Sequence, residues 1–451
     1  MKIQKQVPLT EGPILKSLTG LAVPIMISSF LGTLYNITDM AWIGLLGSKA
    51  VAAVGVGGMY VWLSQGLASL ARMGGQVHVA QCLGRGDKER AHRYAKTAVQ
   101  LSILLGLAFA AVSLLFTDPL VGFFKLEGAK TILDAKIYMR ITCGLILFSF
   151  LNLTLTGLYT AQGDSKTPFV ANFIGLLINL LLDPLLILGV GPFPRIEVAG
   201  AAVATVSAQF VVMFVMMVGV FRSKKEENVL KGIRLFEPFS KEELGNICKI
   251  GGPTAIQGMV YCMISMVLTR MVAAFGAEAI ATQRVGGQIE SVSWNTADGF
   301  AAALNAFVGQ NYGAKKMDRV QKGYRISFWT VAIWGALIML AFIIFPGPIA
   351  GVFFHEEKAM EIAISYLIII GFSEAFMCVE LMTIGALSGL GKTKLCSVIS
   401  ITATSMRIPL AMVLSRTSLG LDGIWWALTL TSVAKGIIFY LTFRYQMREK
   451  C

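Results

Sequence analysis

The sequence has few charged residues, few histidines and no recognisable enzyme motif. Charged residues make up 14% of the 451 positions, whereas a soluble protein carries about 25%. The three histidines are scattered, and neither an HExxH zinc motif nor a GxSxG nucleophile motif occurs. The seven cysteines include no CxxC pair, the spacing of many zinc and redox sites. We therefore expect no catalytic residue, no metal site and no cofactor, and we expect that the protein is not an enzyme.

Apolar sequence takes the place of these features. Hydrophobic residues make up 55% of the chain, and the mean hydropathy is +0.68. A helix crosses a membrane with about 20 apolar residues, and helices satisfy their own backbone in hydrocarbon. Because strand alternation is absent, we expect an all-α membrane protein with twelve transmembrane helices. The expected spans lie near residues 17–43, 50–80, 93–116, 131–160, 168–190, 198–221, 245–274, 279–309, 324–350, 360–388, 395–415 and 422–443.

The basic residues predict how the chain is oriented. The formal net charge of +13 comes mainly from Lys and Arg in the two tails and in every second loop. Since such residues stay on the cytoplasmic side, we expect both termini in the cytoplasm and a multi-pass protein of the cell membrane, plasma or inner. The basic loops are short and lack an aromatic-rich binding domain, so we expect membrane lipids as surroundings and no nucleic-acid partner.

The two halves of the chain repeat each other, and the match needs no gap over 67 residues from Pro24 onward. Three pairs separated by 229 positions illustrate the repeat: Pro24 and Pro253, Gly47 and Gly276, Arg90 and Arg319. Since each half would begin and end in the cytoplasm, we expect two six-helix bundles related by a pseudo-two-fold axis along the membrane normal. The expected domains are an N-terminal bundle at 1–222, a cytoplasmic linker at 223–240 and a C-terminal bundle at 241–451. A duplicated apolar chain is typical of a secondary transporter.

Acidic residues inside the expected spans are the strongest functional signal. An ionisable group in hydrocarbon is costly unless it is paired or wet, so it indicates function by default. Asp39 lies late in the first span, and Asn179 and Asp183 share one helix face because they are four residues apart. Thr205 in span 198–221 could add a third oxygen, and Asn152 in span 131–160 could add another.

Two interpretations of these carboxylates remain open. In the structural one, Asp183 and Pro184 end a kinked helix and Asp39 caps another. In the functional one, the two carboxylates repel each other, and a shared proton or a bound cation relieves the repulsion. Hard cations such as Na⁺ favour oxygen ligands of this kind. The second half has Arg407 and Ala411 at the places of Asn179 and Asp183, which favours the functional interpretation because the repeated scaffold does not need the acids.

Further polar residues lie in the second half. Glu290 occurs in span 279–309 together with Arg284 and Asp298, and Glu374 and Glu380 lie in span 360–388. Glu290 and Arg284 could pair with each other, or Glu290 could belong to the polar lining of a substrate path.

The chain resembles bacterial members of the multidrug and toxic compound extrusion (MATE) transporters over nearly its whole length. The runs that carry the resemblance are Asp39-Met-Ala-Trp-Ile-Gly44, Val79-Ala80-Gln81, Val308-Gly309-Gln310 and Gly385-Ala386-Leu387. The resemblance implies a secondary active multidrug exporter that antiports cationic or amphipathic drugs against Na⁺ or H⁺ by alternating access. It implies drugs as small-molecule partners and the coupling ion in place of any cofactor. We expect a monomer.

The resemblance also implies residue roles. The cation site would consist of Asp39, Asn179, Asp183 and Thr205. The hinge would be Pro24, where the backbone lacks a hydrogen bond. Apart from the resemblance, we expect the polar residues of the spans to line a substrate cavity, namely Tyr35, Asn36, Asn152, Gln257 and Glu290.

The sequence departs from the family pattern at two places, which indicates the branch of the family to which it is closer. An alternative function also remains open. The NorM-type branch carries an acid in its seventh span and another in its tenth, whereas this chain has Gln257 and Phe376–Met377 near those places. We therefore expect a chain closer to the DinF-type branch. The alternative function is a flippase for lipid-linked substrates with a related fold, for which Arg270, Arg284 and Arg407 could supply an anion-binding cavity.

Overall fold

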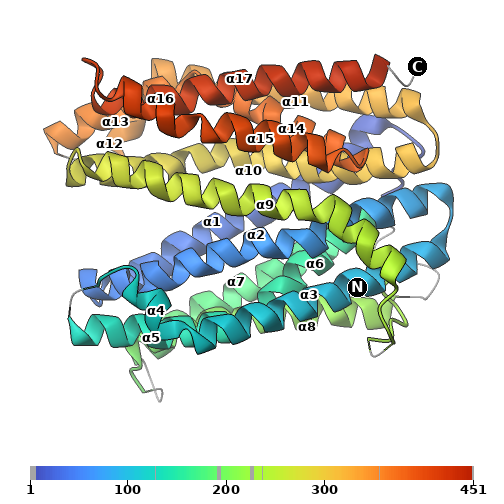
Figure 1. Cartoon of the computed structure of the whole chain (residues 1–451), viewed down its shortest axis with the longest axis horizontal. Helices are drawn as coiled ribbons and strands as arrows, with labels where there is room; N and C mark the ends of the chain where they lie inside the picture. The colour runs from blue at the N-terminus through green and yellow to red at the C-terminus, as the bar shows by residue number, and fades with distance from the viewer. Residues whose placement is uncertain are drawn as a thin grey trace. The chain divides into compact units, whose positions relative to one another are not determined.

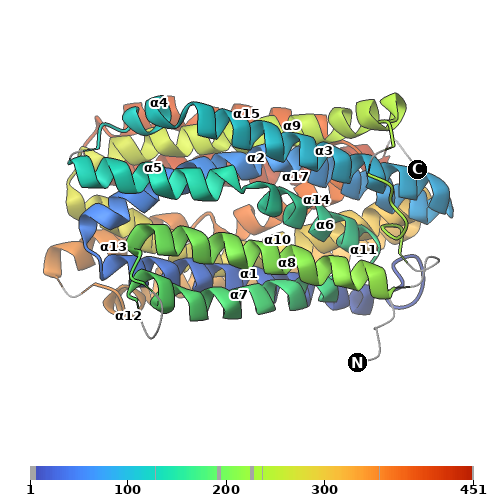
Figure 2. The same cartoon turned by 90° about the horizontal axis from the view of Figure 1, so that it is seen from below.

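The computed structural model describes residues 7–126, 128–189, 194–223, 228–235, 237–354 and 356–448, and these residues are almost entirely helical (Figures 1 and 2). The all-α prediction is confirmed. Contacts divide the chain into two compact units. The first unit contains Val7 and Ile27–Gly258, and the second contains Pro8–Met26 and the residues from Met259 onward.

The helices of the first half alternate long apolar segments with short connections. They are α1 (Ile14–Gly44), α2 (Ser48–Arg85), α3 (Lys88–Leu115), α4 (Thr117–Gly122), α5 (Ala129–Gly144), α6 (Leu147–Ala161), α7 (Lys166–Ile187) and α8 (Glu197–Arg222). The connection from α2 to α3 shows why such turns form. Gly86 takes a left-handed φ of 81°, which glycine adopts without steric cost. Asp87 then caps α3 by accepting a hydrogen bond from the Arg90 amide at 2.9 Å.

The second half repeats this order. Its helices are α9 (Lys241–Ala273), α10 (Ala277–Gly313), α11 (Met317–Ile344), α12 (Pro346–Gly351), α13 (Glu357–Gly371), α14 (Glu374–Gly389), α15 (Thr393–Ser405), α16 (Arg407–Leu414) and α17 (Leu421–Arg448). In each half, one segment that the sequence predicts as a single span consists of two helices with a bend between them. The bend is 43° between α5 and α6 and 50° between α13 and α14. Gly144 and Gly371, at the ends of α5 and α13, weaken the helix at both places.

The number of spans follows from helix length and composition. Among the described residues, nine helical segments are long and apolar enough to cross a membrane when α15 and α16 are counted as one segment (Thr393–Leu414), and the two bent pairs bring the number to eleven. The 37-residue helix α10 is also long enough to cross, although it is more polar because it carries residues such as Glu290. With α10, each of the twelve predicted spans has a helix.

The edges of the compact units differ from the predicted domain limits. The first part of α1 belongs to the second unit, and the part of α9 up to Gly258 belongs to the first unit. The repeat in the sequence divides the chain by connectivity, whereas the units follow packing. In the second unit, for example, α1 lies so close to α10 that a Cβ at Gly299 would be 2.4 Å from the Met26 side chain.

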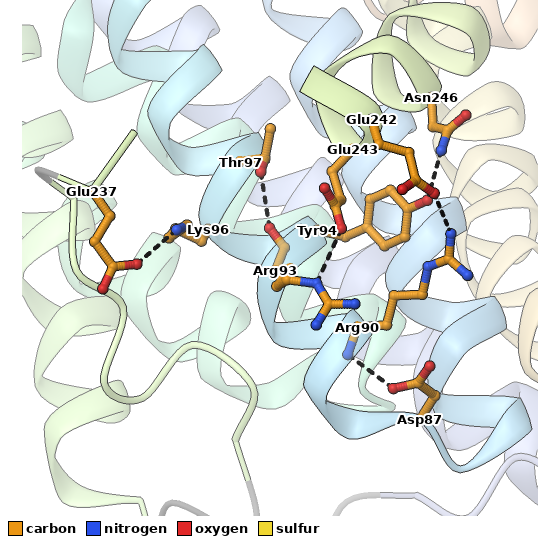
Figure 3. Close-up of polar contacts among 10 residues, drawn as sticks. All are labelled: Asp87, Arg90, Arg93, Tyr94, Lys96, Thr97, Glu237, Glu242, Glu243 and Asn246. Carbon is orange, nitrogen blue, oxygen red and sulfur yellow. Dashed lines mark hydrogen bonds and ion pairs between the residues drawn. The ribbon is translucent and has the colours of Figure 1, made fainter. Parts of the chain in front are cut away.

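Side-chain contacts fix the start of α9 within the first unit (Figure 3). Arg90 pairs with Glu242 at 2.7 Å, and Arg93 pairs with Glu243 at 3.0 Å. Figure 3 shows that these residues project from neighbouring helical turns of α3 and α9. Two ion pairs therefore hold the start of α9 against α3. This contact lies directly after the expected linker at 223–240.

Further along α9, a close contact between its backbone and that of α2 holds the helix in place. A Cβ added to Gly251 would collide with the main-chain oxygen of Leu70 in α2, whereas a Cβ added to Gly252 would meet nothing within 4 Å. We expect Gly251→Ala to destabilise the protein by about 1–3 kcal/mol, because a main-chain atom cannot rotate away from the new methyl group. Gly252→Ala is the matched control and should leave the thermal unfolding temperature unchanged or raise it. Equal unfolding temperatures for the two variants in detergent would contradict this packing.

Candidate functional site

Polar side chains from four helices of the first unit meet within its interior. They come from α1 (Tyr35 and Asp39), α5 (Tyr138), α7 (Asn179 and Asp183) and α8 (Thr205), and we call them the carboxylate cluster. The Tyr35 hydroxyl donates a hydrogen bond to the Thr205 hydroxyl oxygen at 2.9 Å. Asp39 and Asp183 are close enough to interact electrostatically with each other, and both also act on Tyr138. The fold thus joins residues that are up to 170 positions apart.

The two carboxylates of this cluster are buried and lack a basic partner. Asp39 is 8% exposed and Asp183 is 0% exposed. The Asn179 amide nitrogen lies 3.4 Å from one oxygen of Asp183. The Oδ1 atom of Asp39 and the Oδ2 atom of Asp183 have no hydrogen-bond partner among the described residues, and no ion pair of this part of the chain includes either acid. Since buried charge is costly unless it is compensated, this arrangement is suited to a positive ion or a proton.

Local sequence explains how the cluster forms. Tyr35 and Asp39 are one helical turn apart on α1, as are Asn179 and Asp183 on α7, so each pair lies on one face. Glycines provide the close approaches that the cluster needs. A Cβ at Gly57 in α2 would collide with the Tyr138 ring, and one at Gly200 in α8 would lie 2.6 Å from the Leu186 main chain.

Asn152 lies in α6 and is bound to a residue that sequence reasoning missed. Its amide nitrogen donates to the main-chain oxygen of Gln209 at 2.8 Å and to the side-chain oxygen of Gln209 at 2.7 Å. Gln209 follows Thr205 by one helical turn of α8. Asn152 is therefore placed one turn from the carboxylate cluster, and its donor groups are directed to Gln209. Tyr138 was also missed, because no charge or motif spacing marks it in the sequence.

The other cavity and hinge predictions fall elsewhere in the fold. Asn36 is exposed on α1, next to Tyr35, and Gln257 is partly buried on the portion of α9 that belongs to the first unit. Pro24 lies inside α1, which continues through it as a helix. The roles assigned to these three residues stay predictions.

Glu290 belongs to a separate polar cluster of the second unit. The Tyr366 hydroxyl on α13 donates a hydrogen bond to the Glu290 carboxylate, and the buried Arg407 guanidinium interacts with it electrostatically. Arg407 also donates to two hydroxyl groups of α17 at 3.0 and 2.8 Å. Among the described residues, no ion pair joins Glu290 to Arg284. Glu290 instead interacts with Tyr366 and Arg407, which are distant in the sequence.

Two further buried acids of the second unit, Glu374 and Glu380, lie close to another acid and to a basic residue, respectively. Glu374 is 0% exposed and interacts electrostatically with Glu290. Glu380 on α14 forms a buried ion pair with Lys435 on α17, with 2.8 Å between the charged atoms. The second unit thus places the basic side chains of Arg407 and Lys435 beside its buried acids. The carboxylate cluster of the first unit, by contrast, contains no basic side chain.

Comparisons with known proteins agree with this architecture. The MatE family model matches residues 24–185 and 253–413, one stretch in each half. The chain is 29% identical to the probable multidrug resistance protein NorM of Thermotoga maritima, over 98% of this chain and 95% of that protein. It is 26% identical to the probable multidrug resistance protein YoeA of Bacillus subtilis, over 96% of this chain and 94% of that protein.

A solved structure shares the whole fold. It is the outward-facing conformation of a multidrug resistance MATE family transporter of the MOP superfamily, with a TM-score of 0.91 and 23% identity, over 100% of this chain and 99% of that chain. This likeness confirms the predicted fold class of twelve transmembrane helices in two six-helix bundles.

Proposed function

Because the chain belongs to the MatE family, we propose that it is a secondary active exporter that exchanges cationic or amphipathic drugs for Na⁺ or H⁺ by alternating access. The family is one of transporters and not of enzymes, and the two relatives named above are each described as a probable multidrug resistance protein. The chain is a multi-pass membrane protein. Drug export by this chain is supported by matches that cover both of its halves.

The observation that carries the proposal is the pair of buried acids, which have no ion pair with a basic side chain among the described residues. Asp39 and Asp183 repel each other when both are ionised, since little water screens them. One proton or one Na⁺ ion removes most of that repulsion. The side-chain oxygens of Asn179 and Thr205, on the neighbouring helices, are suitable additional ligands for a hard cation. They favour Na⁺ slightly over H⁺ as the coupling ion.

The cluster also offers a route from ion binding to helix movement. Asp39 and Tyr35 lie on α1, and Tyr35 is bound to Thr205 of α8, so a change of charge at Asp39 acts on α1 directly. Pro24 removes one hydrogen bond from α1 and makes a bend easiest there. Bending of α1 would change the cavity and release the drug. Because drug and ion compete, each lowers the affinity for the other by the same factor.

The topology and the assembly belong to the same proposal. Both termini would lie in the cytoplasm, since the basic residues are concentrated in the tails and in alternate loops. The two six-helix bundles at 1–222 and 241–451 would be joined by the cytoplasmic linker at 223–240, and the transporter would act as a monomer in the lipid bilayer.

A flippase for lipid-linked substrates is less well supported. It needs free basic side chains in an anion-binding cavity. Arg407 is buried and bonded to hydroxyl groups of α17 beside Glu290, so one of the three arginines considered for that cavity is already engaged.

Dye transport in proteoliposomes tests the proposed function. We expect a cationic dye to be moved against its concentration gradient when a Na⁺ or H⁺ gradient is imposed, and we expect the two gradients, applied separately, to identify the coupling ion. Protein-free liposomes serve as the control. Dye movement that only equilibrates, whichever ion gradient is present, would indicate a channel and contradict the proposal.

A further inference from the structure

A groove of about 590 Å³ opens on the second unit between α11 and α17. Its floor is aromatic. The rings of Tyr324 and Phe443 stack with 3.6 Å between their centroids, and those of Phe328 and Tyr440 lie 5.1 Å apart. The groove volume lies within the range of about 300–1,000 Å³ that is usual for small-molecule sites.

The rim of this groove is basic. Arg325 on α11 and Arg444 and Arg448 on α17 line it, and all three side chains are exposed. None of the ion pairs of the described residues includes any of them. Trp329 lies beside them and is 57% exposed. The groove therefore combines three exposed arginine side chains, none of them in an ion pair among the described residues, with an apolar, aromatic surface.

The repeat shows what fills the corresponding place in the first unit. Helices α3 and α11 both have 28 residues and begin 229 positions apart, so Lys96 corresponds to Arg325 and Gln100 to Trp329. Gln100 donates to the main-chain oxygens of Leu235 and Glu237 at 2.8 and 2.7 Å. Leu235 and Glu237 of the linker between the two halves therefore lie against α3 at the corresponding place in the first unit.

This linker has an apolar part and a negative group. Leu230 is 4% exposed and packs in the same core cluster as Tyr94 and Val220. The carboxylate of Glu237 pairs with Lys96 at 2.8 Å, as Figure 3 shows. The hydrogen bond and charge of Lys96 lower the pKa of the Glu237 carboxyl, so this rim stabilises an anion. At the corresponding place in the first unit, the linker thus supplies an apolar side chain and an anionic group.

We propose that the groove between α11 and α17 binds an anionic phospholipid, with the headgroup phosphate at Arg325, Arg444 and Arg448 and an acyl chain over the aromatic floor. Arginine binds phosphate through paired hydrogen bonds, and basic pockets between membrane helices bind acidic headgroups. Trp329 and Tyr440 suit the membrane interface, where such rings are enriched. This site is separate from the carboxylate cluster and adds a function to transport.

Quenching of Trp329 by brominated lipids tests the proposal. Protein in mixed micelles is titrated with brominated phosphatidylglycerol or brominated phosphatidylcholine, and the Trp329 signal is the difference between the parent protein and Trp329→Phe. We expect half-maximal quenching of this signal at a concentration of brominated phosphatidylglycerol that is at least about tenfold lower than that of brominated phosphatidylcholine. The triple variant R325Q/R444Q/R448Q should remove that preference.

The triple variant K322Q/K392Q/K394Q is the matched control, because it removes the same charge from exposed positions of the same unit. It should keep the preference for phosphatidylglycerol. Native mass spectrometry of the parent protein and the two triple variants gives a second readout that needs no tryptophan variant. Equal quenching by both lipids in the parent protein, or equal lipid retention by both triple variants, would overturn the proposal.

Discussion

Asp39→Asn should abolish ion-driven drug transport while leaving the protein folded. Asparagine has nearly the shape of aspartate, so the packing of α1 is kept, but the cluster loses one of its two negative charges. With the ion bound, Asp39 is one partner of a buried pair of opposite charges, and losing one partner of such a pair costs about 3 kcal/mol or more, which is about a hundredfold in affinity for the ion. Gradient-driven dye transport in proteoliposomes should fall to the background of protein-free liposomes.

Asp118→Asn is the control for this variant. Asp118 is an exposed acid of the same unit that pairs with Lys136 at 2.8 Å, and an exposed pair contributes little to stability. Transport by Asp118→Asn should remain close to that of the parent protein. Full gradient-driven transport by Asp39→Asn would exclude the carboxylate cluster as the coupling site.

Lys435→Met should strongly destabilise the second unit. Both side chains of the Lys435–Glu380 pair are 6% exposed, so the substitution leaves the Glu380 carboxylate buried without its cation. Losing one partner of a buried ion pair costs about 3–5 kcal/mol. The expected measurement is a large fall in the thermal unfolding temperature of the detergent-solubilised protein.

The double variant with Glu380→Gln separates the buried charge from the loss of packing. It removes the uncompensated carboxylate and should recover much of the lost stability, since replacing a whole buried pair is often nearly neutral. The exposed pair of Lys358 and Glu278, with 72% and 34% exposed side chains, provides the control, and Lys358→Met should leave the unfolding temperature nearly unchanged. A double variant as unstable as Lys435→Met would show that packing by the lysine stem matters more than its charge.

The sequence was sufficient to predict the helical architecture but not the course of each helix. Long apolar segments and the 229-residue repeat indicated twelve spans in two halves. Hydropathy does not report a change of helix direction, so residues 131–160 and 360–388 were each predicted as one span. The structure bends both, and only Gly144 and Gly371 mark the breaks.

The candidate site was predictable where its members are acidic or one helical turn apart. Asp39 and the pair of Asn179 and Asp183 stood out for those reasons, and the fold brings them together. Tyr138 and Gln209 were missed because they are neutral and reach the site from other helices. Long-range pairing also decided the environment of Glu290, which meets Tyr366 rather than a neighbour in sequence.

Ion uptake by the purified protein tests most directly whether the buried carboxylate pair takes up the coupling ion. Bound Na⁺ is counted with a radioactive tracer and bound H⁺ by pH titration, for the parent protein and for Asp183→Asn. Our account predicts one ion per parent molecule, displaced by drug, and no corresponding uptake by Asp183→Asn. The same uptake by both proteins would contradict it.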